Sequence, residues 1–492
     1  MPVHDLPRPF RRCVLVALLI ASVLLVICFG YREGISWRDW GDLHPTSGTW
    51  IATASDASFG LLYRPIYSSL GYGGCRYAPL RSLIQAALLR VGMGPIGSTF
   101  LIGIASMAAL LAAAFVLMRQ METPAGFAAA MMCFILAAGA ARLAVLAGLS
   151  DVLAAALNFW GIIAVVRLTV DPGRHQRIFA VLPASTLFVL ALLTKITSIF
   201  GIVTALVWLL MRHRGRLASK LAVIFLIEAL VAFFATQLAS HGRFLSVFAA
   251  SALAGGAIRG LGEAPIIFFG TLFRSDPVTG GFWIAGVIAA ICSRPRMQLA
   301  TLLLMVTTAA TVPIFGTPGT DINHLLDLEV ASLLCVAACF TSGRTIAAVP
   351  VGLVIAMTLY SCDLCLREAH RIERDSPRAQ VEFALADAAG SPLTGPLLSE
   401  NPLLPILAGE RPYLLDGFMF AGFASKRPEF AANLLDDLDH RRFRAVILAP
   451  SRGIAEAKLE ATFTHEVMPR VRANYELVAT DGRYLVFLPR SR

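Results

Sequence analysis

Charged residues are scarce in this chain of 492 residues: Asp, Glu, Lys and Arg make up only 15% of it, whereas apolar residues make up 57%. An ordinary soluble domain carries about 25% charged residues. Together with a mean hydropathy of +0.70, this excludes a purely soluble protein. Apolar runs close to the ~20 residues that cross a hydrocarbon core recur along the chain. They lack the alternation of transmembrane strands, so the sequence predicts a polytopic α-helical membrane protein.

Motifs that would point to other functions are also missing. The formal net charge is +10, but no basic segment with interleaved aromatics occurs, so we expect no nucleic-acid partner. No metal-ligand spacing, glycine-rich phosphate loop or nucleophile elbow is present. The nine cysteines form no framework, because most lie in apolar runs as small buried residues do. Cys75 is expected to be a packing residue, with a disulfide to Cys362 or Cys365 as the alternative.

The sequence predicts about 11 membrane spans. Arg8, Arg11 and Arg12 precede the first apolar run, Cys13 to Phe29, and no small-x-small cleavage site follows it. We therefore expect an uncleaved first span with a cytoplasmic N-terminus, and the later basic loops fall on the same side. The further predicted spans are residues 96–118, 124–140, 151–168, 178–193, 197–211, 221–238, 281–292, 298–315, 325–340 and 345–360.

Two domains are expected. Residues 1–361 form a transmembrane domain with a large first outward loop, residues 31–95, and an outward segment, residues 240–277, has the helical spacing of an interfacial helix. After Tyr360 charged residues become frequent, so residues 362–492 are predicted to form a soluble extracytoplasmic α/β domain. Its predicted elements are strands at 396–399, 412–415 and 444–448, a helix at 454–474, and a hairpin of 475–480 and 484–488 around Asp481-Gly482.

Polar residues concentrate in the outward loops. Transporters usually place charged groups within the membrane, but here the spans contain few, Glu228 being the clearest. This distribution favours chemistry at the membrane interface. A transporter or flippase of a lipid-linked saccharide is the alternative that Glu228 supports, and a non-catalytic envelope-assembly protein whose tail binds partners is a third hypothesis.

The first outward loop carries the most distinctive order of residues. Asp39 and Asp42 follow the first span. The loop then continues to the second span through a helix-like TWIATASDASF, Tyr63-Arg64-Pro65 and GYGGCRYAPL. Together with the soluble tail, this order resembles the GT-C fold glycosyltransferases, membrane enzymes that take a sugar from a polyprenyl-phosphate carrier. The resemblance extends to the bacterial members related to mannosyl- and arabinosyltransferases.

The resemblance implies a GT-C type hexosyl- or pentosyltransferase of the inverting kind. Its donor would be a polyprenyl-phosphate-linked sugar, and its acceptor an extracytoplasmic glycan, lipid or protein. It also implies a multi-pass protein in contact with the lipids of a bacterial inner membrane, with a cytoplasmic N-terminus and an extracytoplasmic C-terminal domain.

Sugar transfer from a phosphate to a hydroxyl needs a base near the acceptor and cations near the departing phosphate. The resemblance makes Asp42 the first choice for the base and Asp39 the second. Asp42 is alternatively a ligand of a divalent cation, Mg²⁺ or Mn²⁺, that orients the acceptor or the phosphate. The purely structural alternative for either residue is a capping aspartate in a turn.

Substrate and phosphate contacts are expected from basic and polar outward residues. Lys195 stands alone in a minimal turn between two predicted spans, against the positive-inside bias. Asp151 begins a span, where it is either a site residue or a helix cap. His324 binds a phosphate or protonates a leaving group in this hypothesis. The candidates are Tyr63, Arg64, Arg76, Tyr77, Asp151, Lys195, Asn323 and His324, whereas Arg243 and Arg259 are expected to contact headgroups.

Overall fold

The chain forms two compact units. The computed structural model describes residues 8–170, 178–255, 258–292, 298–317, 319–341, 347–391, 393–449, 466–481 and 484–491. The first unit, here called the membrane unit, contains Met1–Gly34, Leu101–Phe233 and Ala257–His370. The second, the C-terminal unit, contains Ile35–Phe100, Phe234–Gly256 and Arg371–Arg492. This division differs from the predicted boundary after residue 361, because most of the first loop groups with the C-terminal residues.

The membrane unit consists of helices. Residues 171–177, 293–297 and 342–346, which include three of its predicted connections and the start of the span predicted at 345–360, lie outside the described residues. Its elements, including those that continue into the C-terminal unit, are α1 (Arg8–Asp39), α4 (Pro95–Gln120), α5 (Ala125–Cys133), η1 (Phe134–Leu136), α6 (Gly139–Leu146), α7 (Asp151–Val170), η2 (Ile178–Val181), α8 (Leu182–Thr194), α9 (Phe200–Met211), α10 (Gly215–Ala239), η3 (Ile258–Gly262), α12 (Ala264–Gly270), η4 (Thr271–Ser275), α13 (Pro277–Ile291), α14 (Gln298–Ile314), η6 (Ile322–Leu325), α15 (Leu326–Thr341) and α16 (Ala348–Asp375).

The prediction of a polytopic helical membrane protein is confirmed. Among the described residues, six helical segments are long and apolar enough to cross a membrane, and a bent pair of helices brings the number to seven. Ten of the predicted spans fall on single helical segments, the shorter apolar helices α8, α9, α13 and α14 included, and the span at residues 124–140 falls on the bent pair. The number of about 11 crossings stays a prediction.

The predicted span at residues 124–140 is bent rather than straight. The helical axes on the two sides of the break, Ala125–Leu136 and Gly139–Leu146, differ by 71°. Arg142 of α6 donates to the carbonyl oxygen of Ala137, which lies at the break, and Ser361 Oγ of α16 donates to the same oxygen at 2.5 Å. These donors satisfy a backbone group that the bend removes from the helical ladder. The sequence-based prediction of a continuous span is therefore corrected here.

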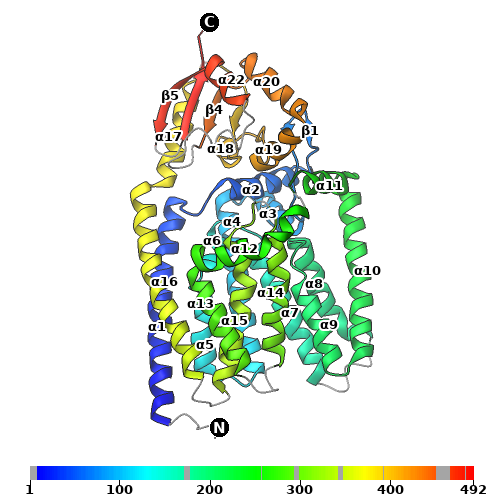
Figure 1. The fold of residues 1–492 in the computed structure, drawn as a ribbon. Helices are drawn as coiled ribbons and strands as arrows, with labels where there is room; N and C mark the ends of the chain where they lie inside the picture. The colour runs from blue at the N-terminus through cyan, green and yellow to red at the C-terminus, as the bar shows by residue number, and fades with distance from the viewer. Residues whose placement is uncertain are drawn as a thin grey trace. The chain divides into compact units, whose positions relative to one another are not determined.

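Helices of the membrane unit pack side by side (Figure 1). α7 contacts α8 and α9, α15 contacts α13 and α14, and α14 contacts α9. Small residues permit this close packing: a Cβ on Gly286 of α13 would lie 2.8 Å from Ser332 Cα of α15. Close approach through glycine is common between membrane helices. The packing holds the ends of α7, α8, α9 and α15 in one neighbourhood.

The C-terminal unit mixes helices and short strands. Beyond the helices shared with the membrane unit, its elements are α2 (Pro45–Ser58), β1 (Tyr67–Ser68), β2 (Gly71–Tyr72), α3 (Leu80–Arg90), α11 (Arg243–Gly255), α17 (Pro377–Ala389), β3 (Leu397–Ser399), α18 (Leu403–Leu407), α19 (Gly417–Lys426), η8 (Pro428–Ala431), α20 (Ala432–Asp439), β4 (Ala445–Leu448), α22 (Val467–Asn474), β5 (Tyr475–Asp481) and β6 (Tyr484–Pro489). The predicted helix in the first loop corresponds to α2, and residues 240–277 are largely helical as expected. Their location at a membrane interface stays a prediction.

A four-stranded sheet of order β3-β4-β6-β5 organises the C-terminal residues. β3 and β4 are parallel, and the other neighbours are antiparallel. The predicted hairpin is confirmed by the pairing of Asp481 with Tyr484. The predicted strand at 412–415 is wrong, since only Leu414 forms a bridge, to Tyr72 of the first loop. Of the predicted helix at 454–474, residues 454–465 lie outside the described residues.

Strand β4 shows why this sheet forms. Its four residues, Ala-Val-Ile-Leu, are all buried. Ala445 and Ile447 join a core with residues of α17, whereas Val446 and Leu448 join a second core with residues of α20 and α22. Side chains alternate between the faces of a strand, so a continuous apolar run belongs to a sheet that is covered on both faces.

Candidate active site

The turn between α8 and α9 presents Lys195. Helix α8 ends at Thr194 because Lys195 adopts an extended backbone, with φ −150° and ψ 110°. The Ser198 amide donates to the Lys195 carbonyl at 2.9 Å. Asn158 Nδ2 of α7 donates to Ser198 O at 3.1 Å and to Ser198 Oγ at 2.7 Å. These bonds fix the turn, and with it the starting point of the lysine side chain.

Four predicted residues meet at this turn and are called the Lys195 cluster: Asp151, Lys195, Asn323 and His324. Lys195 Nζ forms an ion pair with Asp151 Oδ1 and lies 2.8 Å from His324 Nδ1. Asn323 Nδ2 donates to Asp151 Oδ2 at 2.9 Å. These residues come from the N-terminus of α7, the α8–α9 turn and η6, so segments far apart in the sequence converge.

Asp151 is the residue that holds the cluster together. Its two carboxylate oxygens bind different partners, Lys195 and Asn323. It is buried, with 7% of its side chain exposed, against 18% for Lys195. An ion pair shielded from water is stronger than the same pair on a surface. Asp151 therefore positions the ammonium group of Lys195.

Turn η6 orients His324. Asp321 Oδ1 accepts the Ile322 amide at 2.7 Å, and the His324 amide donates to Asp321 O at 3.2 Å. Because an ammonium group only donates, His324 Nδ1 accepts from Lys195, and a neutral His324 then carries its proton on Nε2. The ring can therefore offer a hydrogen-bond donor on the side away from Lys195.

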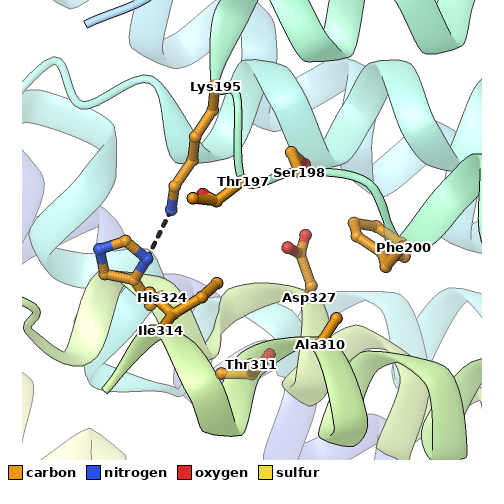
Figure 2. Close-up of a pocket in the computed structure, with 9 residues that line it drawn as sticks. All are labelled: Lys195, Thr197, Ser198, Phe200, Ala310, Thr311, Ile314, His324 and Asp327. Atoms are coloured by element: carbon orange, nitrogen blue, oxygen red, sulfur yellow. Dashed lines mark hydrogen bonds between the residues drawn. The ribbon is translucent and has the colours of Figure 1, made fainter. Parts of the chain in front are cut away.

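The cluster borders a pocket in the membrane unit (Figure 2). Figure 2 shows Lys195 and His324 on one side, and the Asp327 carboxylate pointing toward the turn that carries Thr197 and Ser198. The lining residues are Lys195, Thr197, Ser198, Phe200, Ala310, Thr311, Ile314, His324 and Asp327. The pocket thus combines two basic groups, a carboxylate and several hydroxyls.

The sequence analysis missed Asp327 as a pocket residue. It follows His324 by three positions, a spacing that places side chains on the same face of a helix. Asp327 Oδ1 is buried and has no hydrogen-bond partner among the described residues. Helical spacing applied from His324 onward would have identified it.

Asp42 and Asp39 lie in different environments within the C-terminal unit. Asp42 is buried, and Ser36 Oγ donates to its Oδ2 at 2.6 Å. The Asp42 amide in turn donates to Ser36 Oγ at 3.1 Å. Asp39 ends α1 and pairs with the half-exposed Arg38, Nη2 to Oδ2 at 2.6 Å. Asp39 is thus paired with an arginine, whereas Asp42 accepts a hydrogen bond from a hydroxyl.

Arg64 does not fit the predicted phosphate-binding role. It is fully buried, and its Nε and Nη2 donate to the two carboxylate oxygens of Asp56 at 2.8 Å each. Its Nη1 donates to the carbonyl oxygens of Leu70 at 3.2 Å and Pro412 at 2.5 Å. The guanidinium is used by the protein itself, and we assign Arg64 a structural role.

Tyr63 and Tyr77 are held by the same loop. Tyr63 Oη donates to Tyr77 O at 2.8 Å, and burial raises the pKa of Tyr63. The Tyr77 ring stacks on Trp50, with centroids 4.2 Å apart, and burial raises its pKa also. Both phenols therefore stay protonated at neutral pH.

Arg76 connects the first loop to α19. Its guanidinium lies 4.6 Å from the Phe418 ring centroid and 5.6 Å from that of Tyr77. Asp416 caps α19 by accepting the Met419 amide at 3.2 Å. Burial raises the pKa of Asp416, and the charge of Arg76 opposes that rise. Arg76 is half-buried and is placed for packing as much as for ligand contact.

Other candidates have structural explanations. Glu228 of α10 accepts from Ser185 Oγ at 2.5 Å and Thr186 Oγ1 at 2.9 Å, so its charge is satisfied by α8. Cys75 is a free, buried thiol, and burial raises its pKa to about 11. Arg243 begins α11, and the Arg259 side chain lies outside the described residues. In the part of the chain that the structure describes, no group of three or more His, Cys, Asp or Glu side chains is arranged to hold a metal ion.

Comparison with known proteins identifies the architecture. No protein-family model and no curated protein sequence matches the chain. The structure is similar to that of ArnT from Cupriavidus metallidurans bound to undecaprenyl phosphate, with a TM-score of 0.57, 12% identity, and 94% of this chain and 97% of that chain covered. The same protein in its apo state gives a TM-score of 0.54 at 12% identity, with the same coverage.

A second similarity is to the archaeal oligosaccharyltransferase AglB from Archaeoglobus fulgidus, in complex with an inhibitory peptide and a dolichol-phosphate. Its TM-score is 0.50 at 10% identity, with 99% of this chain and 75% of that chain covered. The chain has the GT-C fold. This confirms the predicted GT-C architecture, with its membrane helices and C-terminal domain, whereas the mannosyl- or arabinosyltransferase subtype stays a prediction.

Proposed function

We propose that this GT-C protein is a membrane glycosyltransferase that uses a polyprenyl-phosphate-linked sugar as donor. The observation that carries the proposal is the Lys195 cluster, in which a lysine and a histidine are held beside a pocket by a buried aspartate. The similar ArnT structure contains undecaprenyl phosphate, and that of AglB contains a dolichol-phosphate and a peptide. These ligands support a lipid-phosphate donor and leave the acceptor open among glycan, lipid and protein.

Lys195 and His324 are assigned to the departing phosphate. When the bond between the anomeric carbon and the phosphate oxygen breaks, negative charge grows on the phosphate. The fixed ammonium group of Lys195 and the Nε2–H donor of a neutral His324 stabilise such charge in a partly dehydrated site without reorganisation. Asp151 and Asn323 position them and do not contact the reacting atoms in this scheme.

Asp42 is assigned as the general base. It removes the proton of the acceptor hydroxyl while that oxygen attacks the anomeric carbon, and a single displacement inverts the configuration there. Its burial and the bond from Ser36 Oγ hold the carboxylate in a fixed orientation, which a general base needs in order to meet the acceptor hydroxyl. Asp39 is the second candidate.

A divalent cation, Mg²⁺ or Mn²⁺, stays a prediction. Since no three-ligand group occurs among the described residues, the steps above are written for protein side chains alone. Titration of the rate with EDTA and then with Mg²⁺ or Mn²⁺ tests the requirement directly.

The deciding experiment measures sugar transfer by the purified full-length protein. Lipid-linked sugars that accumulate in a deletion strain are identified by mass spectrometry and supplied in nanodiscs without an ion gradient. The proposal predicts release of polyprenyl phosphate together with a glycosylated acceptor. Asp42→Asn is expected to lower the rate about 10²–10⁴-fold, the range for loss of a general base.

A full rate for Asp42→Asn contradicts the assignment of the base. Movement of the intact donor across the membrane of sealed proteoliposomes, without any product, supports the flippase alternative instead. Glu228→Gln is the matched variant, because it should affect transport and leave transfer unchanged.

A further inference from the structure

Arg81 is a buried arginine outside the candidate active site. It lies in the first turn of α3, in the C-terminal unit, and is 0% exposed. The N-cap position of α3 is Pro79, and no side chain caps the helix. The first amide groups of a helix lack helical acceptors and carry partial positive charge. The Arg81 backbone thus lies at an electropositive helix end, and its side chain reaches along α3 to Gln85.

The guanidinium of Arg81 is only partly satisfied. Nη1 donates to Gln85 Oε1 at 2.9 Å, and the charge lies 5.0 Å from the centroid of the Trp50 ring. Among the described residues, Nε and Nη2 of Arg81 have no hydrogen-bond partner, and neither has the buried hydroxyl of Ser82. Gln85 is itself fixed, since its Nε2 donates to Thr99 Oγ1 at 2.7 Å.

Arg64, in the same unit, shows which kind of group binds the Nε and Nη2 edge of an arginine. The same two nitrogens of Arg64, Nε and Nη2, bind both carboxylate oxygens of Asp56 at 2.8 Å. This side-on edge of a guanidinium matches two oxygens of a carboxylate or a phosphate. In Arg81 the equivalent edge has no such partner among the described residues.

The unpaired Arg81 guanidinium costs more free energy than the paired guanidinium of Arg64. A buried charge without a partner costs several kcal/mol, which is why buried arginines are normally paired. Burial lowers the pKa of Arg81, and no charged group is among the causes of that shift. The cation–π contact with Trp50 offsets part of the cost, since such contacts contribute about 0.5–2 kcal/mol. The remaining two donors, Nε and Nη2, are of the kind that binds an anionic ligand.

We propose that the Nε and Nη2 edge of Arg81 forms a phosphate-binding site. This edge binds two phosphate oxygens. The phosphate belongs either to a free phosphate ion or to a prenyl phosphate, which present the same group to the arginine. The site is formed by residues other than the Lys195 cluster and does not depend on the transfer reaction.

Thermal unfolding of the full-length protein in phosphate-free detergent buffer tests the site. The probes are inorganic phosphate, a short prenyl phosphate and the corresponding prenol. A ligand that binds the native state raises the unfolding temperature. The variants are Arg81→Met, Arg81→Lys and the control Arg90→Met, in the same helix, whose guanidinium donates to the carbonyl oxygens of Ser58 and Ala57.

Without phosphate, Arg81→Met should unfold at the wild-type temperature or above it, because an unpaired buried charge is removed. With phosphate, the wild type should be stabilised, and Arg81→Met should bind at least about tenfold more weakly, the loss expected for a charged hydrogen bond. Arg81→Lys keeps the charge without the two-nitrogen edge and should be intermediate. Arg90→Met should retain the wild-type shift.

A shift with both phosphates indicates a site for the phosphate group itself, and a shift with prenyl phosphate alone indicates the lipid as source. Both results support the proposal. Equal stabilisation by the prenol, no shift of the wild type, or a full shift in Arg81→Met each overturns it. If Arg81→Met fails to fold, the Arg81→Lys titration decides. No donor sugar is needed, so failure here is distinguishable from failure of the proposed transfer.

Discussion

Lys195 and Arg64 are both basic residues held by a buried aspartate, one in each unit of the molecule. Asp56 and two carbonyl oxygens take up the Arg64 guanidinium, whose side chain is 0% exposed. Lys195, bound by Asp151 and His324, is 18% exposed and borders a pocket. A buried ion pair is therefore no indicator of function by itself. What distinguishes the two is whether part of the cation stays exposed and borders a pocket.

The largest expected effect is on stability, at Arg64. Arg64→Met leaves Asp56 buried without its partner, and breaking a buried pair costs about 3–5 kcal/mol. We expect a large fall in the unfolding temperature, and loss of activity only in proportion to unfolded protein. Wild-type stability with a selective loss of donor binding would instead place Arg64 in a substrate site.

Lys195→Met should show the opposite behaviour. Its expected result is a rate of sugar transfer lower by about 10²–10³-fold, as for loss of one donor to developing negative charge. The unfolding temperature should fall less than in Arg64→Met, because Asn323 still donates to the Asp151 carboxylate and Lys195 is partly exposed. The rate is therefore expressed per folded protein, measured by gel filtration and thermal unfolding. If the rate is unchanged while stability falls, Lys195 resembles Arg64, and the contrast between the two pairs disappears.

A smaller effect is expected at Asn323. Asn323→Ala removes one hydrogen bond to the Asp151 carboxylate and loosens the orientation of Lys195, for which we expect about a tenfold loss of kcat/KM. Because Asn323 acts through Asp151, kcat should fall more than KM rises. Asn323→Asp is the paired variant, and its added charge beside Asp151 should lower the rate further.

The smallest effect is expected at Asp39. Its partner Arg38 is 55% exposed, and exposed ion pairs contribute about 0–1 kcal/mol. Asp39→Asn should change the transfer rate by less than about threefold, in contrast to Asp42→Asn. A larger loss at Asp39 than at Asp42 would reverse the assignment of the base.

The helical segments and most strands follow from the sequence because they depend on local composition. Runs of apolar residues predict membrane helices, and Asp481-Gly482 predicts the β5–β6 hairpin. The bend at Ala137 does not follow, since its supporting donors, Arg142 and Ser361, come from other parts of the chain. The false strand at 412–415 has the same origin, a partner that local patterns do not reveal.

The candidate site was predictable only in part. Assigning Asp151, Lys195, Asn323 and His324 to the same predicted side of the membrane identified them, but their mutual contacts depend on how three helix ends pack. The structural role that we assign to Arg64 was not predictable, for the converse reason. Its partner Asp56 lies eight residues away on the buried face of α2, and sequence alone does not show that the pair is closed off from ligands.

The bonds that Asn158 donates to Ser198 leave no room for a side chain at Gly201. A Cβ added at Gly201 of α9 would lie 2.1 Å from Asn158 Oδ1, far inside van der Waals contact. A single methyl group there would force the amide, the turn it holds and the start of the lysine side chain to shift together. The position of the Lys195 ammonium group thus depends on having glycine, which has no side chain, at position 201 of the helix that follows the turn.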